Sequence, residues 1–185
     1  IAADANVMNF DLSSGANANT LTLSAGVEGA VTATVGSTGD TVTNNANVAL
    51  TVKGTHTAIT AVAISGGTGT DTIEVTGDDI NETNTINLSS GGTSTGIEKI
   101  LVVDHGDKTS GTDSSKNPRS GRDVYITTGS YATALTVDAS ALDAANHDTS
   151  GDGTINSSDN SEEKLTFVGS GATKVLTVTG GAGAD

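Results

Sequence analysis

The stretch Ala61-Val-Ala-Ile-Ser-Gly-Gly-Thr-Gly-Thr-Asp-Thr-Ile-Glu-Val75 holds the two features from which a fold can be predicted for this chain. At both ends, apolar residues alternate with small or polar ones, which is the period of a β-strand with one buried face. Between them, the glycine-rich segment Gly66–Asp71 breaks the alternation and is typical of a turn. The stretch therefore predicts a strand, a tight turn and a second strand.

The same alternation recurs along the whole chain, with Gly, Asn, Asp and Ser clusters between the runs. The best candidate for a helix is the short segment Ala139–Asn146. Many short strands at fairly regular spacing predict an all-β fold, either a β-sandwich or an irregular β-solenoid. The expected strands cover 21–23, 31–35, 48–52, 62–64, 73–75, 86–88, 100–103, 124–126, 135–137, 165–167 and 176–178.

Two long loop insertions, 104–123 and 143–163, interrupt this rhythm. They suggest a division into a β-rich module at 1–103 with a glycine turn at 66–74, a loop insertion at 104–123, and a β-rich module at 124–185. A partial repeat supports a modular array, because Gly66-Gly67 and Gly180-Gly181 each follow a short apolar strand. The chain is expected to be a segment of a longer polypeptide.

Composition excludes several classes of protein. The 185 residues include 8 Lys and Arg against 22 Asp and Glu, a formal charge of −14, so a basic face for nucleic acid is not expected. Without cysteine there is no disulfide framework and no thiolate metal site. No apolar run approaches the roughly 20 residues that span a bilayer. Acidic, aromatic-poor chains are often disordered, but the regular spacing of the apolar residues favours a folded chain.

The segment Gly66–Glu74 matches the nonapeptide G-G-x-G-x-D-x-U-x without a mismatch. Glycines allow a tight turn whose carbonyl groups point inward, and an aspartate adds a carboxylate, so the turn offers the oxygen ligands that Ca²⁺ prefers. The predicted ligands are Gly67, Gly69 and Asp71, with Asp185 at the end of a second, incomplete copy. The alternative is a glycine-rich turn without a metal.

A second predicted calcium site lies in the loop 148–159, which follows the spacing of an EF-hand loop. Oxygen-bearing side chains stand at the ligand positions, Gly153 permits the sharp turn, and Ile155 anchors the loop to the core. A strand rather than a helix follows, so this is expected to be an inserted calcium loop; the alternative is a solvated acidic loop. The predicted ligands are Asp148, Ser150, Asp152, Thr154, Asn156 and Asp159.

Two resemblances carry these observations further. The loop 148–159 resembles the calcium loops of dockerin modules in Asp148, Asp152, Gly153, Ile155, Asn156 and Asp159. More widely, the chain resembles bacterial RTX proteins and calcium-dependent S-layer proteins at 66–74, at 86–92 together with 95–98, at 135–142 and at 175–185. This resemblance implies an extracellular, Ca²⁺-stabilised, β-rich segment of a surface layer, filament or adhesin.

The sequence therefore favours a structural repeat unit of a secreted bacterial surface assembly (S-layer, filament or extracellular matrix) that associates with itself. It carries no familiar catalytic motif and is not expected to be an enzyme. One alternative is a calcium-dependent adhesin or carbohydrate-binding module for a cell-surface glycan; another is the C-terminal secretion region of an exported hydrolase. The extended piece Ile1–Phe10 is a candidate for pairing with a neighbouring subunit.

Overall fold

The computed structural model describes residues 7–36, 38–76, 85–88, 93–103, 124–142 and 165–182. In the N-terminal part the elements are β1 (Met8–Asp11), β2 (Thr20–Leu23), β3 (Val31–Thr34), β4 (Thr41–Asn44), β5 (Leu50–Thr55), α1 (His56–Ala61), β6 (Ala63–Ser65) and β7 (Thr72–Thr76). They continue with β8 (Ile86–Asn87), β9 (Ser94–Thr95), β10 (Lys99–Val103), β11 (Val124–Thr127), β12 (Leu135–Asp138), β13 (Leu165–Val168) and β14 (Leu176–Thr179).

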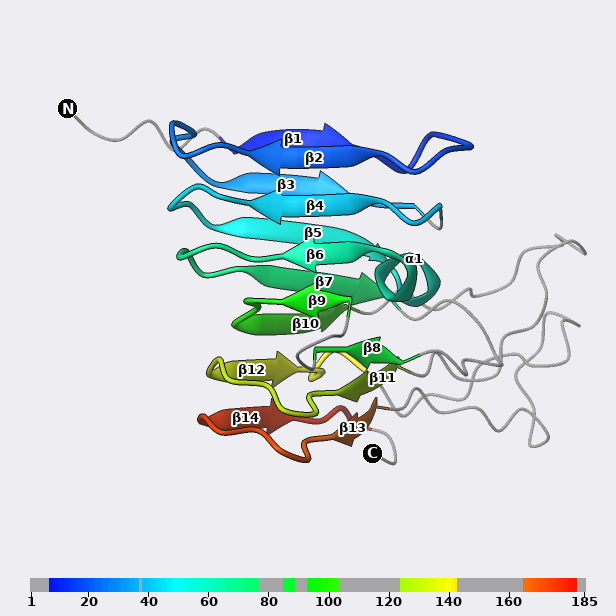
Figure 1. The fold of residues 1–185 in the computed structure, drawn as a ribbon. Coiled ribbons are helices and arrows are strands. Elements are labelled where there is room, and N and C mark those ends of the chain that lie inside the picture. The colour runs from blue at the N-terminus through cyan, green and yellow to red at the C-terminus, as the bar shows by residue number, and fades with distance from the viewer. Residues whose placement is uncertain are drawn as a thin grey trace, which may run out of the picture.

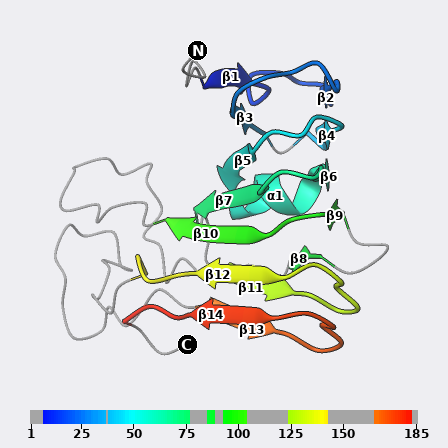
Figure 2. The same cartoon turned by 90° about the vertical axis from the view of Figure 1, so that its left-hand side faces the viewer.

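The strands form three sheets, and every strand pair within the described residues is parallel. The largest sheet has seven strands in the order β1-β3-β5-β7-β10-β12-β14. A four-stranded sheet, β2-β4-β6-β9, and a three-stranded sheet, β13-β11-β8, lie opposite it. The chain thus crosses repeatedly between two faces and stacks the crossings from the N-terminal to the C-terminal end (Figures 1 and 2). We call one passage from the seven-stranded sheet across to a smaller sheet and back a circuit.

The predicted all-β sandwich or irregular β-solenoid is wrong. The fourteen strands of the described residues lie in parallel sheets, and a short helix joins two of them, so the arrangement has an α/β-like element that neither predicted architecture includes. The physical reason is that a period of two specifies which side chains are buried but not which strands pair or in which direction. Parallel neighbours need a crossover between them, and here the opposite sheet supplies most crossovers.

The core is a set of apolar rows that run perpendicular to the strands between the facing sheets. We call the best-defined row of the seven-stranded sheet the central row; its members are Phe10, Ala33, Val52, Ile73, Ile100, Val137 and Val178, one per strand. The five inner members have no exposed surface. Small and β-branched side chains suit this narrow space because each must pack against identical positions on both neighbouring strands.

The helix α1 begins after Thr55, whose side chain accepts a hydrogen bond from the backbone N–H of Ala58 and so caps the first turn. His56, Ala58 and Ile59 are buried, and α1 contacts β5, β7 and β8. The sequence prediction missed this helix because its six residues are too few for an apolar period to be visible. The expected helix at 139–146 does not form over its described part, 139–142. In the described part of the chain, no helix has the length and apolarity needed to cross a membrane.

Candidate functional site

The glycine turn that the sequence singled out places a carboxylate inside the protein. Asp71 stands directly before β7, and its side chain is completely buried. Its Oδ1 accepts hydrogen bonds from the backbone N–H of Leu50 and the side-chain Nδ2 of Asn44, both at 3.0 Å. Its Oδ2 accepts one from the backbone N–H of Gly67 at 2.6 Å. One carboxylate therefore joins the turn to two segments of the preceding circuit.

The partner Asn44 completes this connection from the opposite sheet. It ends β4 and is buried, and its Nδ2 also donates to the carbonyl of Val48 at 2.9 Å. Its Oδ1 accepts the backbone N–H of Ala46 at 3.1 Å. Asn44 is not among the site residues expected from the sequence. The available signal was an asparagine at an inward position of an alternating strand, where an apolar residue is expected.

A second acidic residue extends the arrangement into the next circuit. Glu98 Oε2 accepts the backbone N–H of Asp71 at 2.8 Å, and the Asp71 carbonyl accepts the backbone N–H groups of Glu98 and Lys99 at 3.0 and 3.1 Å. Burial raises the pKa of the Glu98 carboxyl above its ordinary value; the N–H of Asp71 opposes this shift, and the Asp71 carboxylate adds to it. The two acidic residues thus occupy equivalent positions on β7 and β10, one residue before each strand.

Tyr131, which lies later in the chain, contacts the same region through the backbone of Ile97. Its hydroxyl accepts the backbone N–H of Ile97 at 2.6 Å and donates to the carbonyl of the same residue. Burial raises the pKa of Tyr131 to about 12, so the hydroxyl stays protonated and available as a donor at neutral pH. Because only 4% of Tyr131 is exposed, its ring is not available to stack on a ligand.

The glycines of the turn are required by close backbone contacts. A Cβ added to Gly66 would lie 1.8 Å from the carbonyl oxygen of Gly96. A Cβ on Gly67 would lie 2.8 Å from the carbonyl oxygens of Asn44 and Ala46, and one on Gly69 would lie 2.3 Å from that of Val48. The glycines therefore let the turn lie directly against the backbone of its neighbours.

A second buried aspartate with the same arrangement of backbone hydrogen bonds is Asp40. This buried residue precedes β4; its Oδ1 accepts the backbone N–H of Asn19 at 2.8 Å and its Oδ2 that of Gly36 at 3.0 Å. In both turns the Oδ2 bond comes from a glycine four residues earlier, and an Oδ1 bond comes from a backbone N–H 21 residues earlier. Burial pushes the pKa of Asp40 upward, but its hydrogen bonds outweigh burial and hold the pKa below its ordinary value. The motif Gly36-Ser-Thr-Gly39-Asp40 was the signal in the sequence.

The calcium ligands predicted from the sequence divide into two groups. Gly67, Gly69 and Asp71 are brought together by the turn, but the contacts of the Asp71 carboxylate described above are to hydrogen-bond donors, which a bound cation would have to displace. Calcium binding there stays a prediction. The others lie outside the described residues: Asp148, Ser150, Asp152, Thr154, Asn156, Asp159 and Asp185. Within the ranges that the structure describes, no three His, Cys, Asp or Glu side chains gather as a metal site would require.

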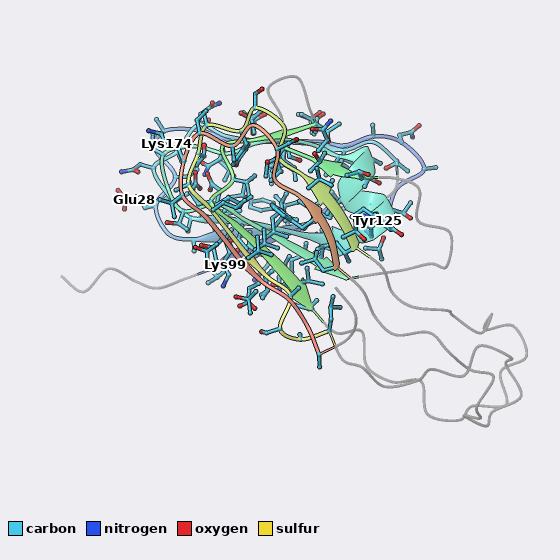
Figure 3. All side chains as sticks on the ribbon, turned by 90° about the horizontal axis from the view of Figure 1, so that it is seen from below. Glu28, Lys99, Tyr125 and Lys174 are labelled. Carbon is cyan, nitrogen blue, oxygen red and sulfur yellow. The ribbon has the colours of Figure 1, made fainter. Side chains whose placement is uncertain are left out.

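An open hollow of about 390 Å³ lies beside Glu98 and Lys99, where β10, β12 and β14 begin. Its lining is mostly threonine and small apolar side chains: Thr70, Glu98, Lys99, Ala134, Leu135, Thr136, Val175 and Thr177. No local pattern predicts this hollow, because its lining residues are far apart in the sequence and meet only through the stacking of circuits. Viewed along the stack in Figure 3, Lys99 and Tyr125 lie on opposite sides, so Tyr125 does not border the hollow.

Comparisons with known proteins give no family assignment: no protein-family model, curated protein or solved structure matches this chain.

The raised pKa of Glu98 leads to a prediction about Glu98→Gln. Glutamine keeps an oxygen that can accept the Asp71 N–H but never becomes charged. A carboxyl whose pKa is higher in the folded protein contributes its full stability below its unfolded pKa and loses that contribution as pH rises through the folded pKa. As the pH rises from acidic to neutral, we therefore expect the free energy of unfolding of the wild type to fall relative to that of Glu98→Gln. The expected difference is only about 0.5 kcal/mol, because solvent screens the partly exposed side chain.

Urea unfolding at several pH values, at constant ionic strength, measures this difference. Glu28→Gln is the control, because it removes the same charge from an exposed side chain. A stability difference between wild type and Glu98→Gln that does not change with pH would contradict the expected coupling.

Proposed function

We propose that this chain is a non-catalytic structural unit of a secreted bacterial surface assembly, such as a surface layer, filament or extracellular matrix. One observation carries the proposal: the buried acidic and phenolic groups are used to join circuits of the backbone. Asp40, Asp71 and Tyr131 each bind backbone groups from segments distant in sequence. Buried side chains whose polar atoms bind the backbone of neighbouring circuits stabilise the stack and do not face a substrate.

Calcium is part of this proposal because the loop 148–159 has the ligand spacing of an EF-hand loop. The aspartates of this loop repel one another unless a cation lies between them. Binding would couple the ion to folding, since a ligand that binds only the folded chain stabilises it by mass action. External calcium would then stabilise the chain after secretion.

We expect calcium to raise the melting temperature of chelator-treated protein, with a stabilisation of about 2–3 kcal/mol at a roughly hundred-fold excess of calcium over the dissociation constant. Asp148→Ala combined with Asp152→Ala is expected to abolish most of this rise, because two ligands are lost. Circular dichroism during heating measures it. Glu162→Ala with Glu163→Ala removes the same charge just outside the motif and should leave the rise intact. If calcium leaves the melting temperature of the wild type unchanged, calcium stabilisation is refuted.

The location of the protein is tested by immunogold labelling of intact cells that produce the full-length polypeptide. Label on the outer surface, decreased by a calcium chelator, is the expected result. Label confined to the cell interior would overturn the proposed function.

The adhesin or carbohydrate-binding alternative has less support. Sugar-binding sites commonly use exposed aromatic rings, and of the two tyrosines near the insertions Tyr131 is buried, while Tyr125 lies away from the hollow beside Lys99. Binding of the purified chain to specific sugars on a glycan array would favour this alternative.

A further inference from the structure

The outer face of the four-stranded sheet β2-β4-β6-β9 consists mainly of threonine. The strands pair in parallel and in register, one below another in Figure 1, so the residues that point away from the core form two rows across the sheet. Ala63 completes the first row. We call the hydroxyl-bearing members of both rows the threonine face: Thr20, Thr22, Thr41, Thr43, Ser65 and Thr95. Four of these side chains are exposed, and Thr41 and Thr43 are partly exposed.

The hydroxyl groups of the threonine face are not used by the fold itself. Within the part of the chain that the structure describes, none of them forms a hydrogen bond with another protein group. Elsewhere on the surface, the hydroxyl groups of Ser13 and Ser140 bind neighbouring aspartates. The hydroxyl groups of the threonine face are therefore available to water or to a ligand.

The described outward positions of this sheet also carry no charge, although the chain has a formal charge of −14. The outer face of the seven-stranded sheet is different, because it carries Lys99 and an ion pair in which Lys53 and Glu74 lie 2.9 Å apart. A charge covered by an uncharged ligand would lose its water without gaining a partner. The charge-free threonine face of this acidic protein therefore complements a ligand that is itself uncharged.

The spacing of the threonine face is set by the backbone. Neighbouring strands of a sheet lie about 4.8 Å apart, and outward residues two positions apart on one strand lie about 6.6 Å apart. The face is therefore a two-dimensional grid of hydroxyl and methyl groups with these two repeats, at right angles to each other. Oxygen atoms on the prism plane of hexagonal ice repeat at closely similar distances along two perpendicular directions.

Threonine holds such a grid in place. Its branched Cβ restricts the first side-chain torsion, so each hydroxyl and methyl group loses little freedom on binding. The strands beneath are anchored to the core, because Leu21, Val42 and Ile64 lie between the two outward rows and pack inward. The grid is therefore preorganised for a ligand whose water molecules each contribute little binding energy.

We propose that the threonine face binds ice. Its hydroxyl groups take the positions of lattice oxygen atoms and its methyl groups lie between them, so the first layer of bound water continues the crystal. Molecules bound in this way force ice to grow as curved fronts between them, which lowers the freezing temperature without changing the melting temperature. This activity goes beyond the proposed structural role and does not depend on it.

Thermal hysteresis, the gap between melting and freezing temperatures, tests the proposal with the whole chain in calcium-containing buffer. The wild type is expected to open this gap and, with a fluorescent label, to bind the surface of a single ice crystal. Thr43→Tyr places a bulky ring in the middle of the grid and should lower the hysteresis to less than half of the wild-type value at equal concentration. Thr51→Tyr is the matched control, since Thr51 is a partly exposed threonine on an inner strand of the seven-stranded sheet. It should leave the hysteresis unchanged.

Circular dichroism verifies that the variants fold. Thr22→Tyr and Thr136→Tyr, at exposed positions of the same two faces, replace any variant that does not. A wild type that is excluded from ice and shows no hysteresis would overturn the proposal, as would an equal effect of the two tyrosine variants. Exclusion from ice together with binding to crystalline cellulose would also overturn it, in favour of a polysaccharide lattice. Immunogold labelling of the cell surface is unaffected by these outcomes, so the proposed function is judged separately.

Discussion

Replacing Asp71 with alanine is expected to lower the free energy of unfolding by about 4 kcal/mol or more. Losses of this size are typical of substitutions that break a buried hydrogen-bond network. The substitution leaves the N–H groups of Leu50 and Gly67 and the amide of Asn44 without their acceptor. Each buried donor left unsatisfied costs about 1–3 kcal/mol. Because these groups come from different segments, the loss also loosens the contact between neighbouring circuits.

Asp71→Asn separates the charge and acceptor roles of this side chain. The asparagine oxygen can still accept bonds at one position, but its NH₂ group then faces a donor at the other, so we expect a loss of about 2–3 kcal/mol. Asp11→Asn is the control: among the described residues this exposed carboxylate accepts hydrogen bonds from its near neighbour Ser13, so the loss of its charge should matter much less.

Urea unfolding followed by circular dichroism measures both changes, with calcium and with a chelator. Equal losses in the two conditions are expected, because the donors are protein groups. If Asp71→Asn unfolds like Asp11→Asn, Asp71 does not hold the circuits together. If the loss appears only with calcium, the predicted metal role of this turn is supported instead.

Gly66→Ala is expected to have the second large effect, a loss of about 3 kcal/mol or more. The new Cβ would lie 1.8 Å from the carbonyl oxygen of Gly96 and 2.7 Å from Oδ2 of Asp71, so the backbone of two circuits would have to separate. That separation would also break the bonds to Asp71. Thermal unfolding followed by circular dichroism measures the loss.

The matched control is Gly26→Ala, because a Cβ at Gly26 meets nothing within 4 Å and its backbone is not in the left-handed region. We expect it to change the stability by less than about 1 kcal/mol, in either direction. Similar melting temperatures for the two variants would contradict the close approach at Gly66.

Several elements of the fold could be predicted from local pattern. The alternation at 31–35 corresponds to β3, where Val31 and Ala33 are buried and Thr32 and Thr34 are partly exposed. The glycine turn before Asp71 was also predicted, as a turn between two strands. These predictions succeed because strand period and glycine-rich turns depend on residues close in sequence.

The site could be predicted only in part. Asp71 was identified, but as a calcium ligand, and its bonds to Leu50 and Asn44 could not be foreseen. Those partners lie 21 and 27 residues earlier, at distances set by the length of each circuit. Glu98 and Tyr131 join the region from still later circuits, and no local pattern connects them to Asp71.

The sequence by itself determined the positions of most of the short strands, though not of β1, β4 and β9, together with the alternation that buries one face of a strand and the places where glycine permits a turn. The tertiary structure alone decided that the strands pair in parallel and that circuits stack. The physical reason is that the alternation of apolar and polar residues specifies which side chains of a strand are buried, and it does so for each strand separately. Pairing is a relation between distant segments, and its energy depends on backbone groups that are the same in every residue except proline.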